Sequence, residues 1–199
     1  QHRECHQHRR QHRPQRRLIP WPCMFGDPIA LTPFTAADAA AFEREMGRPA
    51  RGVRAVAYRC DHGVPAVVQT APRLPGGTPF PTVFYLCCSA LTAAVSRMES
   101  AGLMHEMNAR LAADPDLAAA YRRAHVAYLS VRNAIDDLGI DVSAGGMPDR
   151  VKCLHALVAH ALATGRGVNP LGDEAVDALG DCVRGGAPCA RLAQAGPAR

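Results

Sequence analysis

The helical half of the chain is organised around residues 144–174, AGGMPDRVKCLHALVAHALATGRGVNPLGDE. Pro148 and Asp149 are typical of a helix start, and apolar residues then recur at three- and four-residue spacing until Gly165. This pattern predicts one amphipathic helix, followed by a stiff turn at 168–173 that leads into a last short helix. The polar residues placed around the helix are Lys152, Cys153, His155 and His160. The alternative interpretation is that the cysteine and the histidines only line a core.

Three short strands are predicted in the first half of the chain. Residues 53–58 show the alternation of a strand, and residues 66–70 form a second apolar run. The turn between them, 60–63, ends in Gly63, which can adopt the positive φ that a hairpin loop requires. Residues 82–88 are rich in β-branched and aromatic side chains and form the third strand. The simplest topology is a three-stranded antiparallel meander.

Helices account for most of the remaining residues. Thr35 and Asp38 form a capping-box start for a first helix that stops at Gly47. Ser89 is the expected N-cap of the next helix, and from there the chain is helical to its end. The helices expected there before the central one lie at 90–100, at 103–113 and from Asp116 onward. The sequence therefore predicts a single α+β domain in which about five or six helices cover one face of the meander.

The chain has 199 residues, which is enough for one domain with a hydrophobic core. Residues 1–26 are a Gln/His/Arg-rich extension that we expect to be disordered. Because Met24 is the first methionine, we expect residues 1–23 to lie upstream of the functional unit. The domain is expected at 27–181, and residues 182–199, which include Cys182 and Cys189, are expected to form a frayed tail.

The charge distribution and the cysteine content indicate which classes of protein this chain can belong to. The net charge is +5, but residues 1–17 hold six Arg and one Glu, so 17 basic and 17 acidic residues remain in 18–199. This balance does not indicate a nucleic-acid-binding face, and no Walker or Rossmann nucleotide motif occurs. No apolar run approaches the roughly 20 residues of a membrane span. Without a recognisable signal peptide, the eight cysteines favour a reduced cytoplasmic protein, where Cys and His clusters indicate metal or redox chemistry.

Several motifs resemble those of one protein family. They include Gly47-Arg-Pro-Ala-Arg-Gly-Val53, Gly146-Met-Pro-Asp-Arg-Val-Lys-Cys-Leu-His-Ala-Leu-Val-Ala-His160 and Gly167-Val-Asn-Pro-Leu-Gly-Asp173. On these motifs the chain resembles the actinobacterial family called domain of unknown function 501, over about residues 36–177. The resemblance implies no activity. Genes of that family lie near those of a septum-formation initiator and an exopolyphosphatase, which implies a protein partner linked to cell division.

The sequence predicts a metal site made by Cys60, His62, Cys88 and Cys153. The first strand ends at Cys60, its turn carries His62, and the third strand returns to the same end of the sheet. Cys87 points to the opposite face, so Cys88, which matches a cysteine of the family, is the expected ligand. Cys153 comes from the first turns of the central helix, and the closed Cys3His set suits structural zinc. An iron–sulfur cluster is the alternative, although His62 stands where the family has a cysteine and thiolates are the usual cluster ligands.

An enzyme is the alternative function. Arg and Lys side chains suit a phosphate or carboxylate group, and Cys153 or His155 would supply nucleophilic or acid–base chemistry. On a helix, residues two apart diverge by about 200°, so no hydrogen bond between Cys153 and His155 is expected. The candidates for binding the anion or substrate are Arg51, Arg73, Arg150, Lys152, His155, Asn169 and Asp173. All of them except Arg150 and Asp173 are expected to meet at one surface cleft. The favoured interpretation is a zinc-stabilised, non-catalytic or interaction domain in the cytoplasm.

Overall fold

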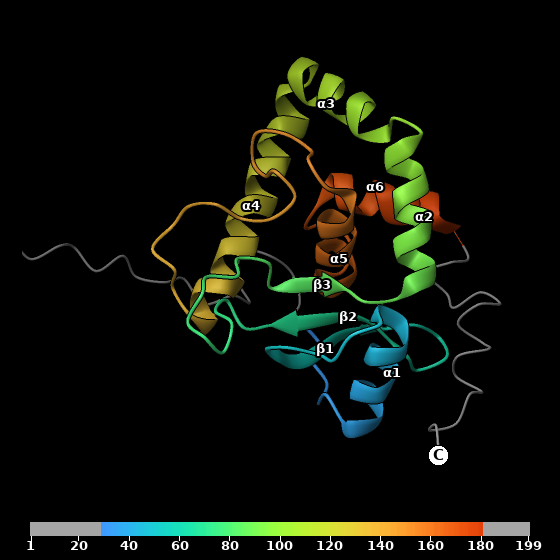
Figure 1. Ribbon diagram of the computed structural model, residues 1–199. Helices are drawn as coiled ribbons and strands as arrows, with labels where there is room; N and C mark the ends of the chain where they lie inside the picture. Colours follow the sequence, from blue (N-terminus) through green and yellow to red (C-terminus); the bar gives the residue numbers. More distant parts are fainter. Residues whose placement is uncertain (1–28, 181–199) are drawn as a thin grey trace, which may run out of the picture.

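The computed structural model describes residues 29–180 (Figure 1). The extension expected at 1–26 and the tail expected at 182–199, with Cys182 and Cys189, lie outside these residues. Within them, six helices and three strands form an α+β arrangement, which confirms the predicted fold class. None of the helices in this part of the chain is long and apolar enough to cross a membrane.

The sheet is the predicted antiparallel meander. Its strands are β1 (Val53–Arg59), β2 (Pro65–Thr70) and β3 (Phe84–Leu86), in the order β1-β2-β3. The third strand is shorter than the predicted run at 82–88. In the turn after β1, the Gly63 N–H donates to the Cys60 carbonyl at 2.8 Å and Gly63 has φ 74°, as a tight turn requires.

Helices cover both faces of this sheet. Val67 and Leu86 belong to the main core, whereas Val68 and Cys87, one position further along their strands, pack with Phe42 of α1 (Ala36–Met46). Neighbouring strand residues point to opposite faces, so β2 is buried on both sides. Figure 1 shows α1 on one side of the sheet and the other helices on the opposite side. The prediction that helices cover one face is therefore wrong for α1.

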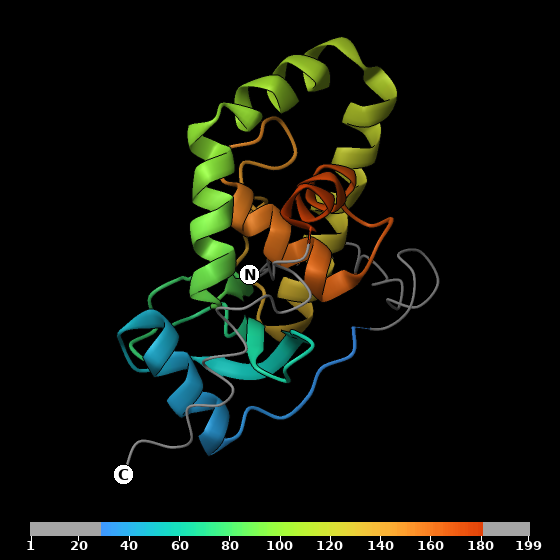
Figure 2. The same ribbon diagram turned by 90° about the vertical axis from the view of Figure 1, so that its right-hand side faces the viewer.

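The main core is built around a central helix. That helix is α5 (Leu154–Thr164), which packs against β3, α2 and α6 and contributes the fully buried Leu154, Leu157 and Val158 (Figures 1 and 2). The sequence therefore identified the central element correctly. The helices around it are α2 (Ser89–Ser100), α3 (Leu103–Ala113), α4 (Pro115–Ile135) and α6 (Pro170–Leu179).

The starts of the first two helices show which N-caps can be predicted from neighbouring residues. At α1 the predicted capping box is present: the Asp38 N–H donates to Thr35 Oγ1 at 3.2 Å, and the Thr35 N–H donates to the Asp38 carboxylate at 2.9 Å. At α2 the N-cap position belongs to Cys88 and not to Ser89, and the Cys88 side chain makes no capping hydrogen bond. Ser89 is already helical, and its N–H donates to the Glu45 carboxylate at 2.7 Å. A carboxylate from another helix thus replaces the predicted local cap.

Two later helices begin with proline. Asp114 caps α4 by accepting from the N–H groups of Asp116 and Leu117, so the helix starts one residue earlier than predicted. Asn169 caps α6 by accepting from the Gly172 N–H at 3.0 Å, so this helix begins inside the predicted turn. Proline suits the first helical position because no N–H is needed there.

The largest correction to the predicted elements concerns the start of α5. The helix begins at Leu154, whereas Pro148 and Asp149 had predicted an earlier start. Gly145 and Gly146 have φ values of 70° and 92°, and the chain folds back so closely that a Cβ on Gly145 would lie 2.3 Å from a Leu157 methyl carbon. Residues 144–153 are therefore a compact irregular segment that ends against the helix.

This segment and the residues just before it, from Ile140, are held in place by side chains of α3 and α4. The fully buried Arg132 guanidinium donates to the carbonyl oxygens of Ile140 and Val142. Asn108 bonds both backbone groups of Val151, at 2.8 and 2.9 Å, and the Tyr121 hydroxyl donates to the Arg150 carbonyl at 3.2 Å. These contacts satisfy backbone groups that have no helix or strand partner, so they fix the path of the segment.

Candidate functional site

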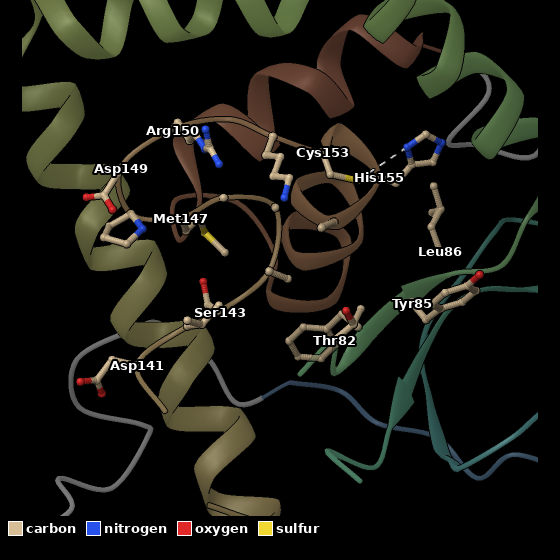
Figure 3. A pocket seen from close by; sticks show the side chains of 18 of the residues that line it. Thr82, Tyr85, Leu86, Asp141, Ser143, Met147, Asp149, Arg150, Cys153 and His155 are labelled. Carbon is tan, nitrogen blue, oxygen red and sulfur yellow. Dashed lines mark hydrogen bonds between the residues drawn. The ribbon is translucent and has the colours of Figure 1, made fainter. Parts of the chain in front are cut away.

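A cleft of about 680 Å³ lies between β3, the segment at 141–153 and the start of α5 (Figure 3). This volume is typical of a small-molecule site. Its apolar lining includes Met46, Phe84, Leu86, Val142, Met147 and Ala156. Its polar lining includes Thr92, Asp141, Asp149, Arg150, Lys152, Cys153 and His155.

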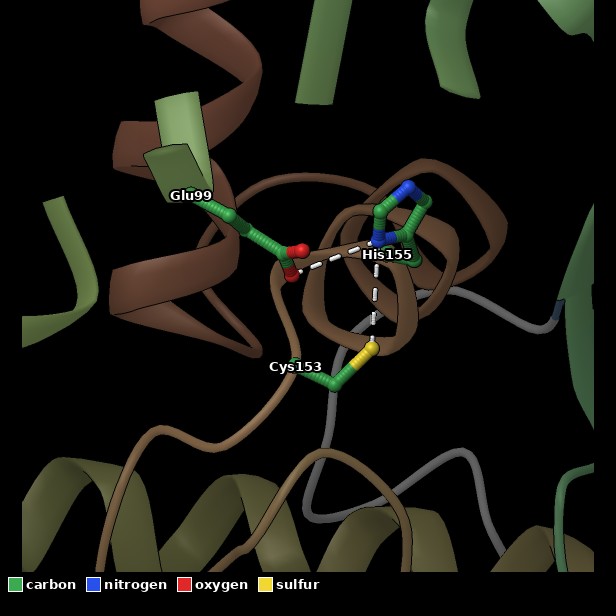
Figure 4. A group of neighbouring side chains, drawn as sticks. All are labelled: Glu99, Cys153 and His155. Carbon is green, nitrogen blue, oxygen red and sulfur yellow. Dashed lines mark hydrogen bonds and ion pairs between the residues drawn. The ribbon is translucent and has the colours of Figure 1, made fainter. Parts of the chain in front are cut away.

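Three side chains that can bind a metal converge at one side of the cleft (Figure 4). They are Glu99, Cys153 and His155, and one ligand atom from each lies within 4.8 Å of the other two. His155 Nδ1 is 3.3 Å from Glu99 Oε1 and 3.9 Å from Cys153 Sγ. All three residues are half-buried, and Cys153 and His155 also line the cleft. This group could hold a metal ion.

The backbone explains why Cys153 reaches His155. Cys153 is the N-cap residue of α5 and has extended backbone angles, φ −155° and ψ 111°, so it does not follow the helical rotation. The expectation that the two side chains diverge by about 200° is therefore wrong, because it assumed that both residues are helical. Glu99 approaches from the last turn of α2, and its carboxylate accepts from the Leu154 N–H at 2.7 Å, the first N–H of α5.

The other ring nitrogen of His155 determines its tautomer. Nε2 lies 3.2 Å from the Thr92 carbonyl oxygen and 3.3 Å from Ser96 Oγ. A carbonyl oxygen can only accept, so Nε2 carries the hydrogen and a neutral ring presents a lone pair at Nδ1. The Nδ1 lone pair then faces the Glu99 carboxylate, which also has only lone pairs. With this tautomer, a metal ion placed between Nδ1 and the carboxylate would make the contact favourable.

The residues predicted as an anion site are only partly brought together. Arg150, Lys152 and His155 line the cleft. Arg51 is exposed before β1 and is not among the residues that line it, and Arg73 forms an ion pair with Asp136 at 2.9 Å.

The last two predicted anion residues have other roles. Asn169 is fully buried as the N-cap of α6. Asp173 lines a smaller cavity beside Arg166, where it accepts from the Gly167 N–H at 2.8 Å, and burial raises its pKa. Neither side chain lines the larger cleft.

The residues predicted as a Cys3His site lie in different settings. Cys60 and Cys88 are buried in the main core, His62 is exposed in the turn after β1, and Cys153 lies at the cleft. Within residues 29–180, the one group of three or more such side chains close enough to share a metal ion is Glu99, Cys153 and His155. That group contains Cys153 but not the other three predicted ligands.

Glu99 is the member of this group that the sequence did not indicate. A signal was present, because Glu99 lies in the last turn of α2, at the negative end of the helix dipole. A carboxylate is unfavourable there unless a donor or cation compensates it. In the structure, the Leu154 N–H donates to this carboxylate at 2.7 Å.

Comparison with known proteins gives one match. Residues 56–177 match the family described as protein of unknown function, DUF501. This match covers more than half of the 199 residues and includes Glu99, Cys153 and His155. Neither the curated proteins nor the solved structures contain a match to the chain.

Proposed function

The chain belongs to the DUF501 family, and we propose that in this member Glu99, Cys153 and His155 hold a zinc ion that opens onto the cleft. The observation that carries the proposal is the convergence of a carboxylate, a thiol and an imidazole whose second nitrogen is held by the Thr92 carbonyl. A backbone carbonyl on the outer nitrogen is the usual way in which a metal-binding histidine is oriented.

The spacing of the three donors fits a tetrahedral ion. Zinc bond lengths of about 2.0–2.3 Å place neighbouring N and O ligands about 3.3 Å apart, and N and S ligands about 3.6 Å apart. The corresponding distances are 3.3 Å from Nδ1 to Oε1 and 3.9 Å from Nδ1 to Sγ. Carboxylate, thiolate and imidazole are all ligands of zinc, whereas one thiolate among three donors does not suit an iron–sulfur cluster.

Three protein ligands leave a coordination position for water. Catalytic zinc sites have this composition, whereas the closed Cys3His site predicted from the sequence would be structural. Zinc-bound water ionises near neutral pH and attacks electrophilic centres. We therefore propose a zinc-dependent hydrolytic function in which Lys152 and Arg150, also in the cleft, favour an anionic substrate.

Metal titration tests the site and separates it from the one predicted from the sequence. Cobalt(II), a zinc substitute whose thiolate bonds absorb in the near ultraviolet, is added to the full chain purified without metal. His155→Ala and Glu99→Gln should weaken this absorbance, whereas His62→Ala should not. Loss of the signal in His62→Ala with retention in His155→Ala would support the Cys3His site and reject ours. Elemental analysis of anaerobically purified protein then identifies the native metal.

A metal-free thiol enzyme is the second candidate. It is favoured by the 3.9 Å contact of Cys153 Sγ with His155 Nδ1, which places a thiol beside a side chain that can act as a base. Hydrolysis of para-nitrophenyl acetate by the zinc-loaded and chelator-treated chain separates the two candidates. Activity that needs zinc supports the metal centre. Activity that survives the chelator and is abolished by iodoacetamide supports the thiol.

The interaction domain remains a third proposal, based on the gene neighbourhood of the family. Its test is a pull-down from native lysate with the wild-type chain and His155→Ala. If both retain the same cell-division partner and neither binds zinc, the interaction domain is the better account.

A further inference from the structure

We infer that the cleft binds an amphipathic anion, with its charged head beside Glu99, Cys153 and His155 and its apolar body along the segment at 141–147. This inference rests on the proposed function for the position of the head group. It adds the chemical class of the ligand, which the metal site alone does not define.

The first observation is an exposed apolar side chain at the rim. Val142 is 62% exposed, the highest value among the exposed large hydrophobic residues of 29–180, and it lines the cleft. Its carbonyl is bound by Arg132, so the backbone at Val142 is held in place. Met147, Phe84 and Leu86 continue the apolar lining beneath it. An apolar ligand body would cover this surface and remove Val142 from water.

The second observation is an unpartnered hydroxyl at the other side. Thr92 Oγ1 is buried and has no hydrogen-bond partner within the described residues, although Thr92 lines the cleft. The carbonyl of the same residue contacts His155 Nε2 at 3.2 Å, so Thr92 lies beside the proposed metal ligands. A buried polar atom without a partner is costly, and a ligand oxygen would supply one.

The third observation concerns charge. Within residues 29–180, Arg150 and Lys152 take part in none of the ion pairs, although both line the cleft. Asp141 and Asp149, its acidic residues, lie on the side away from Cys153 and His155 (Figure 3). The cationic residue adjacent in sequence to the proposed metal site is Lys152. An anionic head group therefore fits the side with the metal ligands, and the apolar body fits the opposite side.

Calorimetry with matched ligand pairs tests this inference on the zinc-loaded full chain. The pairs are inorganic phosphate with octyl phosphate, and acetate with octanoate, so that either oxyanion can serve as the head. Each fully buried methylene raises affinity roughly fourfold. Burial of two methylenes therefore predicts that the ligand with the longer chain binds at least about tenfold more tightly than its short counterpart. Val142→Asp should abolish this gain, whereas Val126→Asp, at another exposed valine, on α4 and outside the cleft, should retain it. Lys152→Ala should weaken both members of a pair by a similar factor.

Three results would overturn the inference. They are equal affinity for the short and long members of both pairs, a gain that survives Val142→Asp, and octanol binding as tightly as octyl phosphate. Zinc content is measured on the same samples, so a loaded chain without the chain-length effect rejects the amphipathic ligand and leaves the metal site standing. A chain that takes up no zinc but keeps the chain-length effect rejects the metal site and leaves the apolar groove standing.

Discussion

Helix α5 carries two histidines, five residues apart, in opposite environments. His160 is fully buried, lies parallel to the Phe84 ring at 5.9 Å and meets the edge of Tyr128 at 5.1 Å. The His155 side chain is 26% exposed, contacts Glu99 and Cys153, and lines the cleft. The same residue type thus faces a sealed aromatic core at one position and an open polar cleft at the other.

The neighbours of each ring decide what it can do. His160 Nδ1 lies 3.3 Å from the Asn169 amide nitrogen, which can only donate, and burial lowers the pKa of His160 to about 3, so the ring is neutral. His155 has a carboxylate and a thiol beside it, and the three side chains together could hold a metal ion. A histidine in the sequence of an apolar helix therefore predicts neither a core role nor a ligand role until its partners are known.

The largest expected effect is a difference in folding stability between variants of the two histidines. His160→Ala should lower the free energy of unfolding of metal-free protein by about 3–5 kcal/mol, because it leaves a cavity between two aromatic rings. His155→Ala should cost less than about 1 kcal/mol, as for an exposed site such as His105→Ala. Urea unfolding measures all three. A larger loss for His155→Ala than for His160→Ala would reverse the comparison.

The second largest expected effect is stabilisation of the fold by zinc bound at Glu99, Cys153 and His155. A free zinc concentration 100 times Kd should raise the free energy of unfolding by about 2.7 kcal/mol in the wild-type chain. The increment should vanish in Glu99→Gln and persist in Glu106→Gln, an exposed glutamate of α3. Thermal or urea unfolding with and without zinc gives the increment. Equal increments in both variants would place the bound zinc elsewhere.

Acid should reduce the contribution of the buried His160 to the stability of the fold over a defined pH range. His160 has a lower pKa folded, about 3, than its ordinary 6.5, so the unfolded chain binds more protons between these values. Its contribution to stability is complete well above pH 6.5 and should fall by about 1 kcal/mol between about pH 6.5 and 5.5. The measurement is the difference in pH slope between wild type and His160→Gln in urea unfolding. Identical slopes would show that His160 is protonated in the native state.

The smallest expected effect concerns the unpartnered hydroxyl of Thr92. Thr92→Val should change the free energy of unfolding of unliganded protein by less than about 0.5 kcal/mol, or raise it slightly, because no hydrogen bond is lost. By contrast, Tyr128→Phe removes the hydroxyl that accepts from the Val83 N–H at 2.8 Å and should cost about 1 kcal/mol. Urea unfolding compares the two. A loss of more than about 1 kcal/mol in Thr92→Val would mean that its hydroxyl already has a partner.

The predictable parts of the fold are those encoded by neighbouring residues. The turn at Gly63 and the capping box at Thr35 involve partners three residues away, and both are present. The start of α5 was mispredicted because Pro148 and Asp149 carry local start signals, whereas distant side chains such as Asn108 and Arg132 hold the segment in another conformation. Long-range contacts of this kind leave no periodic trace in the sequence.

The same distinction between local and long-range contacts explains which residues of the candidate site the sequence could suggest. Arg150, Lys152, Cys153 and His155 come from one short stretch and do meet at the cleft. Glu99 lies 54 residues before Cys153, and only the packing of α2 against α5 brings it to them. The members of the candidate site that the sequence suggested therefore come from one segment. The half contributed by a second helix required the structure.

The segment at 140–151 forms one wall of the cleft, and the way in which it is held has a consequence for evolution. Arg132, Tyr121 and Asn108 hold this wall through backbone groups of residues 140–151. Every amino acid offers the carbonyl oxygens, and every one except proline offers the N–H used at Val151. An exposed side chain that lines the cleft, such as Val142, is therefore not needed to keep this wall in its conformation. Homologues can diverge at these positions, and so diverge in the molecules they select, while they inherit the same cleft.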